Sequence, residues 1–86
     1  MKVNKLVKSS GYTKDILSHF IITLFDNDTD YFICIKEPTL DEYVHLCDRK
    51  VLEWYPDDFH DDSEYIDIYV KMQEKDCVTF KSHRSL

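Results

Sequence analysis

An acid-rich stretch in the middle of this 86-residue chain, PDDFHDDSEYID (56–67), contains six acids and no Lys or Arg. Carboxylates placed this close together repel one another, so they favour contact with water, a cation or a basic surface. His60 lies between two acidic pairs, and together they offer the oxygen and imidazole ligands of a divalent-metal site. The stretch is therefore a solvated loop, a cation site or a surface for a basic partner.

A second acidic stretch, DNDTDYFICIKE (26–37), has acids at its first, third, fifth and twelfth positions. This spacing resembles that of an EF-hand calcium loop, which draws oxygen ligands from those positions. The sixth position of such a loop is Gly, which makes a sharp turn, whereas this chain has Tyr31 there. Pro38 also follows where the exiting helix would continue. We therefore expect a β-hairpin turn, with cation binding as the alternative.

The cysteines and histidines form no recognisable catalytic or zinc-binding pattern. Cys34, Cys47 and Cys77 are odd in number and far apart, which argues against a disulfide framework and against CxxC zinc ligation. Each lies in an apolar run, where we expect a small buried side chain. A chain with a single Gly also has no Gly-rich phosphate loop and no nucleophile elbow. We therefore predict no enzyme activity, no cofactor and no bound metal.

The net charge of −6 is unevenly distributed along the chain. Residues 1–25 carry four Lys and one Asp, residues 26–67 carry fourteen acids and three bases, and residues 68–86 carry four bases and two acids. An acidic middle favours a basic partner, and salt would weaken that attraction. A protein that binds nucleic acid directly would usually have the opposite sign.

The acids also alternate with aromatic residues, which are common in protein interfaces. Same-face carboxylates stand about 6.8 Å apart on a strand, against a phosphate about every 3.4 Å along a DNA strand. This short, acidic and aromatic profile resembles that of DNA-mimic proteins of phages and mobile elements. The resemblance implies an inhibitor or decoy that covers a basic nucleic-acid-binding surface of a host or cognate protein. The residues predicted to contact the partner are Asp26, Asp28, Asp30, Asp41, Glu42, Asp57, Asp58, Phe59, Asp61, Asp62, Glu64 and Asp67.

Other functions fit the same composition. An immunity or antitoxin protein would use an acidic surface to neutralise one basic toxin. A divalent-cation module would use one of the two acidic stretches. An accessory protein that forms homodimers would pair the exposed edges of its sheet. The acids could also serve only to keep a small protein in solution.

The elements that position these residues include a helix predicted over about residues 40–54. Thr39 and Glu42 have the spacing of a capping box, and Pro56 disfavours helical geometry at the residue before it. Between them, apolar residues recur at helical spacing. The expected buried stripe consists of Leu40, Tyr43, Val44, Cys47, Val51, Trp54 and Tyr55.

A β-hairpin is predicted on each side of this helix, within residues 19–37 and 64–83, and residues 2–8 form a further possible strand. The sequence thus predicts one α+β domain spanning residues 1–86, in the order (β)ββαββ. Its sheet would be mainly antiparallel, with the helix packed on one face. Because no apolar run reaches membrane-spanning length, we expect a cytoplasmic protein, either monomer or homodimer.

Overall fold

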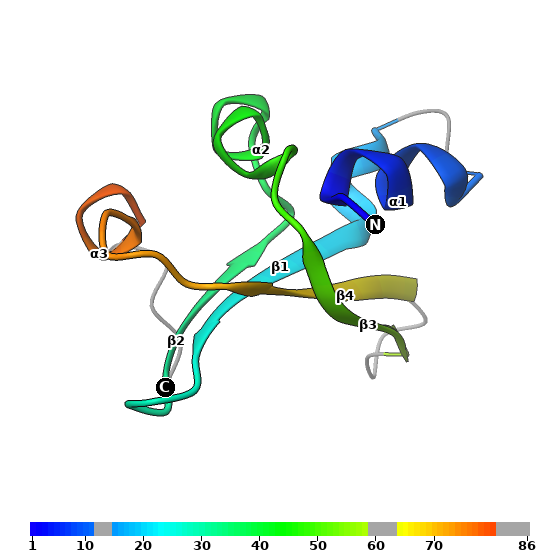
Figure 1. Ribbon diagram of the computed structural model, residues 1–86. Coiled ribbons are helices and arrows are strands. Elements are labelled where there is room, and N and C mark those ends of the chain that lie inside the picture. The colour runs from blue at the N-terminus through cyan, green and yellow to red at the C-terminus, as the bar shows by residue number, and fades with distance from the viewer. Residues whose placement is uncertain (12–14, 59–63, 81–86) are drawn as a thin grey trace.

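The computed structural model, which describes residues 1–11, 15–58 and 64–80, has a four-stranded sheet in the order β2-β1-β4-β3. Figure 1 shows helices gathered on one side of this sheet, which confirms the α+β class. The strands are β1 (Phe20–Asp26), β2 (Tyr31–Lys36), β3 (Val51–Asp58) and β4 (Glu64–Lys71). The helices are α1 (Val3–Ser9), α2 (Leu40–Leu46) and α3 (Asp76–Thr79), with a 3-10 helix η1 (Ile16–His19) before β1.

The sheet is mixed, because its central strands β1 and β4 run parallel while β2 and β3 each pair antiparallel at an edge. The first predicted hairpin is confirmed: β1 and β2 pair from Ile21 with Lys36 to Asp26 with Tyr31. The second hairpin was predicted wrongly, since β4 pairs with β3 and residues 76–79 form α3. The Asp76 carboxylate explains the change, because it accepts the Gln73 backbone N–H and holds a turn that begins a helix.

The helix predicted over about residues 40–54 is also shorter, since α2 ends at Leu46 and β3 begins at Val51. Its predicted capping box is present, with Glu42 N–H donating to Thr39 Oγ1 and Thr39 N–H donating to Glu42 Oε1. Beyond the turn after α2, β-branched and aromatic residues favour a strand, and β4 supplies the partner that they need.

Residues 2–8, a possible strand in the sequence, form most of α1 instead. The first N–H groups of a helix lack partners within it. Here those of Val3 and Asn4 donate to the carbonyls of Arg49 and Cys47, both at 2.9 Å. The chain following α2 therefore caps α1, and the order becomes α1-η1-β1-β2-α2-β3-β4-α3.

The hydrophobic core lies between the sheet and the helices. It is built from alternate residues of the strands, which point to the same face, and from the inward residues of α1 and α2. Its buried members are Val3, Leu6, Val7, Phe20, Ile22, Leu24, Ile33, Ile35, Leu46, Val51, Ile68, Val70 and Phe80.

Candidate protein-binding site

The described acids that were predicted to bind a partner are spread over both ends of the sheet, α2 and one face of β4. Because β1 and β4 are parallel and their edge partners antiparallel, the β1–β2 turn lies at one end of the sheet, while the end of β3 and the start of β4 lie at the other (Figure 1). Residues 26–30 therefore lie at one end, and the backbones of residues 57–58 and 64 lie at the other. Phe59, Asp61 and Asp62 fall outside the described residues. The described acids do not form one continuous row.

The β1–β2 turn uses part of its acidity to hold its own shape. Asp26 accepts the backbone N–H of Asp28 at 3.1 Å and the hydroxyl of Thr29 at 3.0 Å. The EF-hand-like spacing is realised as a hairpin, which places Glu37 beyond the far end of β2 from Asp26. Within residues 1–11, 15–58 and 64–80, no group of three or more His, Cys, Asp or Glu is arranged to hold a metal ion.

Asp67 is also engaged within the protein, on the sheet face opposite the helices. The Thr23 hydroxyl donates to its Oδ1 at 2.9 Å, and Cys34 lies next to Thr23 on β2. Burial, and then the negative charge of Asp67, raise the pKa of the Cys34 thiol. A thiol kept protonated in this way is a poor nucleophile. All three cysteines are free, and none is fully buried as expected: Cys34 and Cys47 are half-buried and Cys77 is exposed.

The end of the sheet where β1 begins carries a hollow of about 460 Å³. It lies between the residues that open η1 and those that lead into α2. We term it the acidic hollow; its lining is Asp15, Ile16, Leu17, Ser18, Glu37 and Pro38. Within the part of the chain that the structure describes, neither acid has a hydrogen-bond or ion-pair partner for its carboxylate. Two such carboxylates beside apolar side chains suit a Lys or Arg, whose stem is apolar and whose tip is charged.

Both acids of the hollow have left-handed backbone conformations, with φ of 49° at Asp15 and 52° at Glu37. This region is uncommon for residues other than Gly, and side chains beyond Asn and Asp fit it poorly. Backbone strain of this kind clusters at functional sites. Neither acid was among the residues predicted to contact a partner, because the sequence does not show that residues 15 and 37 meet at one end of the sheet.

Replacing Glu37 tests this strain directly. We expect Glu37→Gly to be about 1 kcal/mol more stable than Glu37→Ala, because Gly adopts positive φ without a Cβ clash. Urea unfolding of the two variants measures the difference. At positions with negative φ a glycine variant is usually less stable than an alanine variant, because Gly increases the entropy of the unfolded chain. An alanine variant as stable as the glycine variant would show that position 37 is unstrained.

Exposed apolar side chains lie on α2, the helix that follows the acidic hollow in the chain. Leu40 and Val44, one turn apart on α2, are 68% and 62% exposed, and exposed Asp41 lies next to them. Both were predicted to belong to the buried stripe, as were Trp54 and Tyr55, which are 44% and 50% exposed on β3. These four predictions were wrong. Apolar surface rimmed by polar groups is typical of protein-binding sites.

Comparison with known proteins gives no assignment, since no family model, curated protein or solved structure matches this chain. Across residues 1–11, 15–58 and 64–80, no helix combines the length and apolar content that crossing a bilayer requires.

Proposed function

We propose that this protein is an inhibitor or decoy that binds a basic protein through the acidic hollow and the exposed face of α2. A Lys or Arg of the partner would enter the hollow between Asp15 and Glu37, while Leu40 and Val44 contact apolar surface around it. The observation that carries the proposal is a pair of carboxylates that have no partner among the described residues, in a hollow that Ile16, Leu17 and Pro38 also line. The exposed first turn of α2 follows this hollow in the chain.

Long-range charge favours the same end of the sheet. The backbones of Asp57, Asp58 and Glu64, three of the acids predicted from the sequence, lie at this end. Residues 26–30 are separated from the acidic hollow by the length of the β1–β2 pairing, which has six residue pairs. At the rise of a β-strand this length is about 20 Å. That distance exceeds two Debye lengths at physiological salt, so the distant turn contributes little. We propose that this protein acts inside the cell and covers a surface with which its partner binds nucleic acid, as DNA-mimic inhibitors do.

Charge reversal at the two ends tests the location of the site. We expect Asp15→Lys with Glu37→Lys to weaken binding at least 100-fold, because close charge pairs contribute several kcal/mol to such complexes. The matched control is Asp28→Lys with Asp30→Lys, which makes the same change of charge at the opposite end and also alters one left-handed position. It should weaken binding less than threefold. Equal losses from both pairs would contradict a site at the acidic hollow.

The measurement uses isothermal titration with an Arg-rich peptide, and then with the protein retrieved by affinity capture from the native host. Circular dichroism checks that each variant is folded. Affinity should fall steeply as salt is raised, and the captured protein should lose its nucleic-acid binding in the complex. An affinity that salt leaves unchanged would contradict the electrostatic contact, and a complex that still binds nucleic acid would contradict the decoy.

A further inference from the structure

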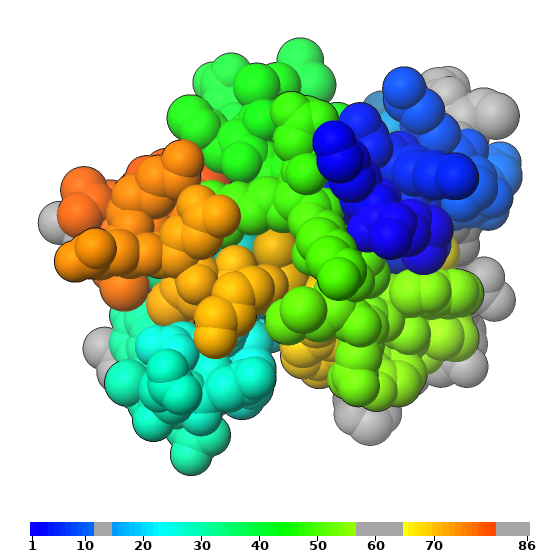
Figure 2. Space-filling view, viewed as in Figure 1, coloured from blue at the N-terminus to red at the C-terminus, as the bar shows by residue number. Residues whose placement is uncertain are grey.

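A second hollow, of about 520 Å³, has a mainly basic lining, although the chain as a whole is acidic. We term it the basic hollow. Its charged and titratable lining is His45, Asp48, Arg49, Lys50, Lys71 and Lys75, which gives four cations against one acid in a chain of net charge −6. Figure 2 shows this face, where residues 45–52 (green) meet residues 70–75 (yellow to orange).

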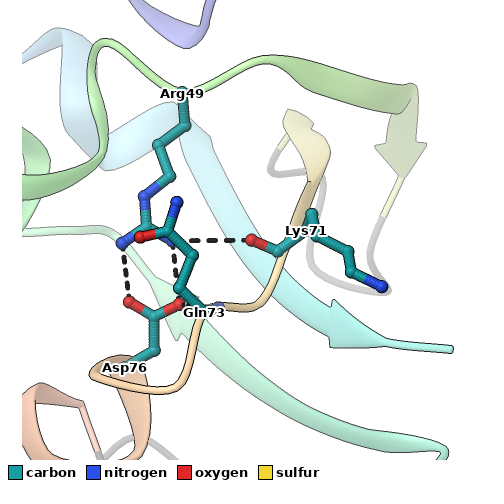
Figure 3. A network of polar contacts seen from close by, with 4 residues as sticks. All are labelled: Arg49, Lys71, Gln73 and Asp76. Carbon is teal, nitrogen blue, oxygen red and sulfur yellow. Dashed lines mark hydrogen bonds and ion pairs between the residues drawn. The ribbon is translucent and has the colours of Figure 1, made fainter. Parts of the chain in front are cut away.

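Arg49 is the least exposed charged residue of this lining, with 10% of its side chain exposed. Its two terminal nitrogens form a fork on Asp76, at 2.8 Å from Nη1 to Oδ2 and 2.7 Å from Nη2 to Oδ1. Nη1 also approaches the Lys71 carbonyl at 3.5 Å. Figure 3 shows that the Lys71 side chain points away from Arg49, which leaves Lys50 and Lys75 as the lysines that can supply charge to the hollow.

These contacts use only part of the guanidinium group. Arg has five N–H donors, and three of them are accounted for by Asp76 and Lys71. The donors left over are the Nε–H and the outer hydrogen of Nη2, which lie side by side on one edge of the planar group. Among the described residues they have no partner. In Figure 3 this edge faces away from Lys71.

We propose that the basic hollow binds a phosphate group through this second edge of Arg49, with Lys50 and Lys75 neutralising its charge. A guanidinium edge matches the spacing of two phosphate oxygens, and lysines bind phosphate as point charges. The Asp76 carboxylate accepts two hydrogen bonds from the first edge of the guanidinium group in the same paired way. This contact fixes the plane of the group, and so the direction in which its second edge faces. This inference is independent of the proposed partner at the acidic hollow.

The size of the hollow and the charge of the chain together indicate the class of ligand. The volume lies within the range of small-molecule sites, so the hollow has room for a phosphate and the group that carries it. A nucleic-acid strand would extend its further phosphates over an acidic protein, which would repel them. A small phosphomonoester keeps its charge inside the hollow. We therefore infer a small phosphomonoester, such as a mononucleotide.

NMR titration with inorganic phosphate and with a nucleoside monophosphate, at constant ionic strength, tests this site. The Nε–H signal of Arg49 and the amide signals of residues 49–50 and 73–75 should shift. Lys50→Gln with Lys75→Gln should weaken binding at least tenfold, since hydrogen bonds to charged groups contribute at least that factor. The matched control is Lys5→Gln with Lys8→Gln on α1, which removes the same charge outside the hollow. It should change the affinity less than twofold.

Three results would overturn the inference. The first is the absence of shifts at Arg49 with either phosphate compound. The second is an equal loss of affinity in both lysine pairs, which would indicate only a general charge effect. The third is tighter binding of a single-stranded oligonucleotide than of the monophosphate, which would assign the hollow to a nucleic-acid strand. All four lysines lie on the surface, so these variants are expected to fold.

Discussion

Replacing Asp76 by Asn is expected to lower the free energy of unfolding by about 3–5 kcal/mol, because it leaves the Arg49 charge buried and unpaired. Asp76 is 1% exposed, and both of its oxygens bond to Arg49. One of them also accepts the Gln73 backbone N–H at 2.6 Å. The substitution keeps the size of the side chain, so the loss would come from charge and hydrogen bonding rather than from a cavity.

Urea unfolding followed by circular dichroism measures this loss. The control is Glu74→Gln, which removes one negative charge two residues away at an exposed position and should change stability by less than about 0.5 kcal/mol. Domains of this size have roughly 4–13 kcal/mol of stability, so the expected loss is a large fraction of the whole. An Asp76→Asn variant as stable as its control would show that the ion pair is open to water.

A double replacement distinguishes the net contribution of the Arg49–Asp76 ion pair to stability from the destabilisation caused by removing only one partner. Arg49→Met with Asp76→Leu removes both charges and keeps apolar volume, and such changes are often neutral or stabilising. We expect it to recover most of the loss caused by Asp76→Asn. The ion pair would then be retained for a reason other than stability. Holding Arg49 in one orientation for a phosphate ligand is such a reason, and the double variant should lose phosphate binding while it stays folded.

The parts of the fold that could be predicted from the sequence are those that depend on neighbouring residues. The β1–β2 hairpin followed from two apolar runs around an Asp- and Asn-rich turn, and the α2 cap followed from the spacing of Thr39 and Glu42. The pairing of β1 with β4 could not be predicted, because it joins strands more than forty residues apart. Once β4 lies beside β1, its free edge accepts β3, and residues 51–54 pair as a strand instead of extending α2.

The sequence led to an acidic binding surface as a prediction, but not to the hollow that the structure contains. Asp15 and Glu37 were not among the predicted contact residues, and the strand order sends residues 26–30 and residues 57–58 to opposite ends of the sheet. The basic hollow was missed because Arg49, Lys50 and Lys75 come from segments separated in the sequence. The only indication of it in the sequence was that Arg49 and Lys50, two of the three bases in residues 26–67, are adjacent.

The largest error in the predicted helix concerns which side of it is buried. The predicted stripe included Val44 and left out Leu46, whereas Leu46 is fully buried and Val44 is 62% exposed. A helix of seven residues contacts the core through few side chains, and Leu46 is the buried one that α2 contributes. The turn into β3 and the contact with α1 determine the position of α2. Neither of these can be inferred from the helical spacing of apolar residues.

We therefore expect Leu46→Ala to lower the free energy of unfolding by about 2–5 kcal/mol, through lost burial and the cavity left behind. Val44→Ala on the same helix should change it by less than about 0.5 kcal/mol, because Ala is the better helix former and little packing is lost. Urea unfolding of both variants measures this difference. Equal losses of stability in the two variants would indicate that α2 has the orientation predicted from the sequence, with Leu40 and Val44 in the core. In that case those residues would not be available to the partner proposed for the acidic hollow.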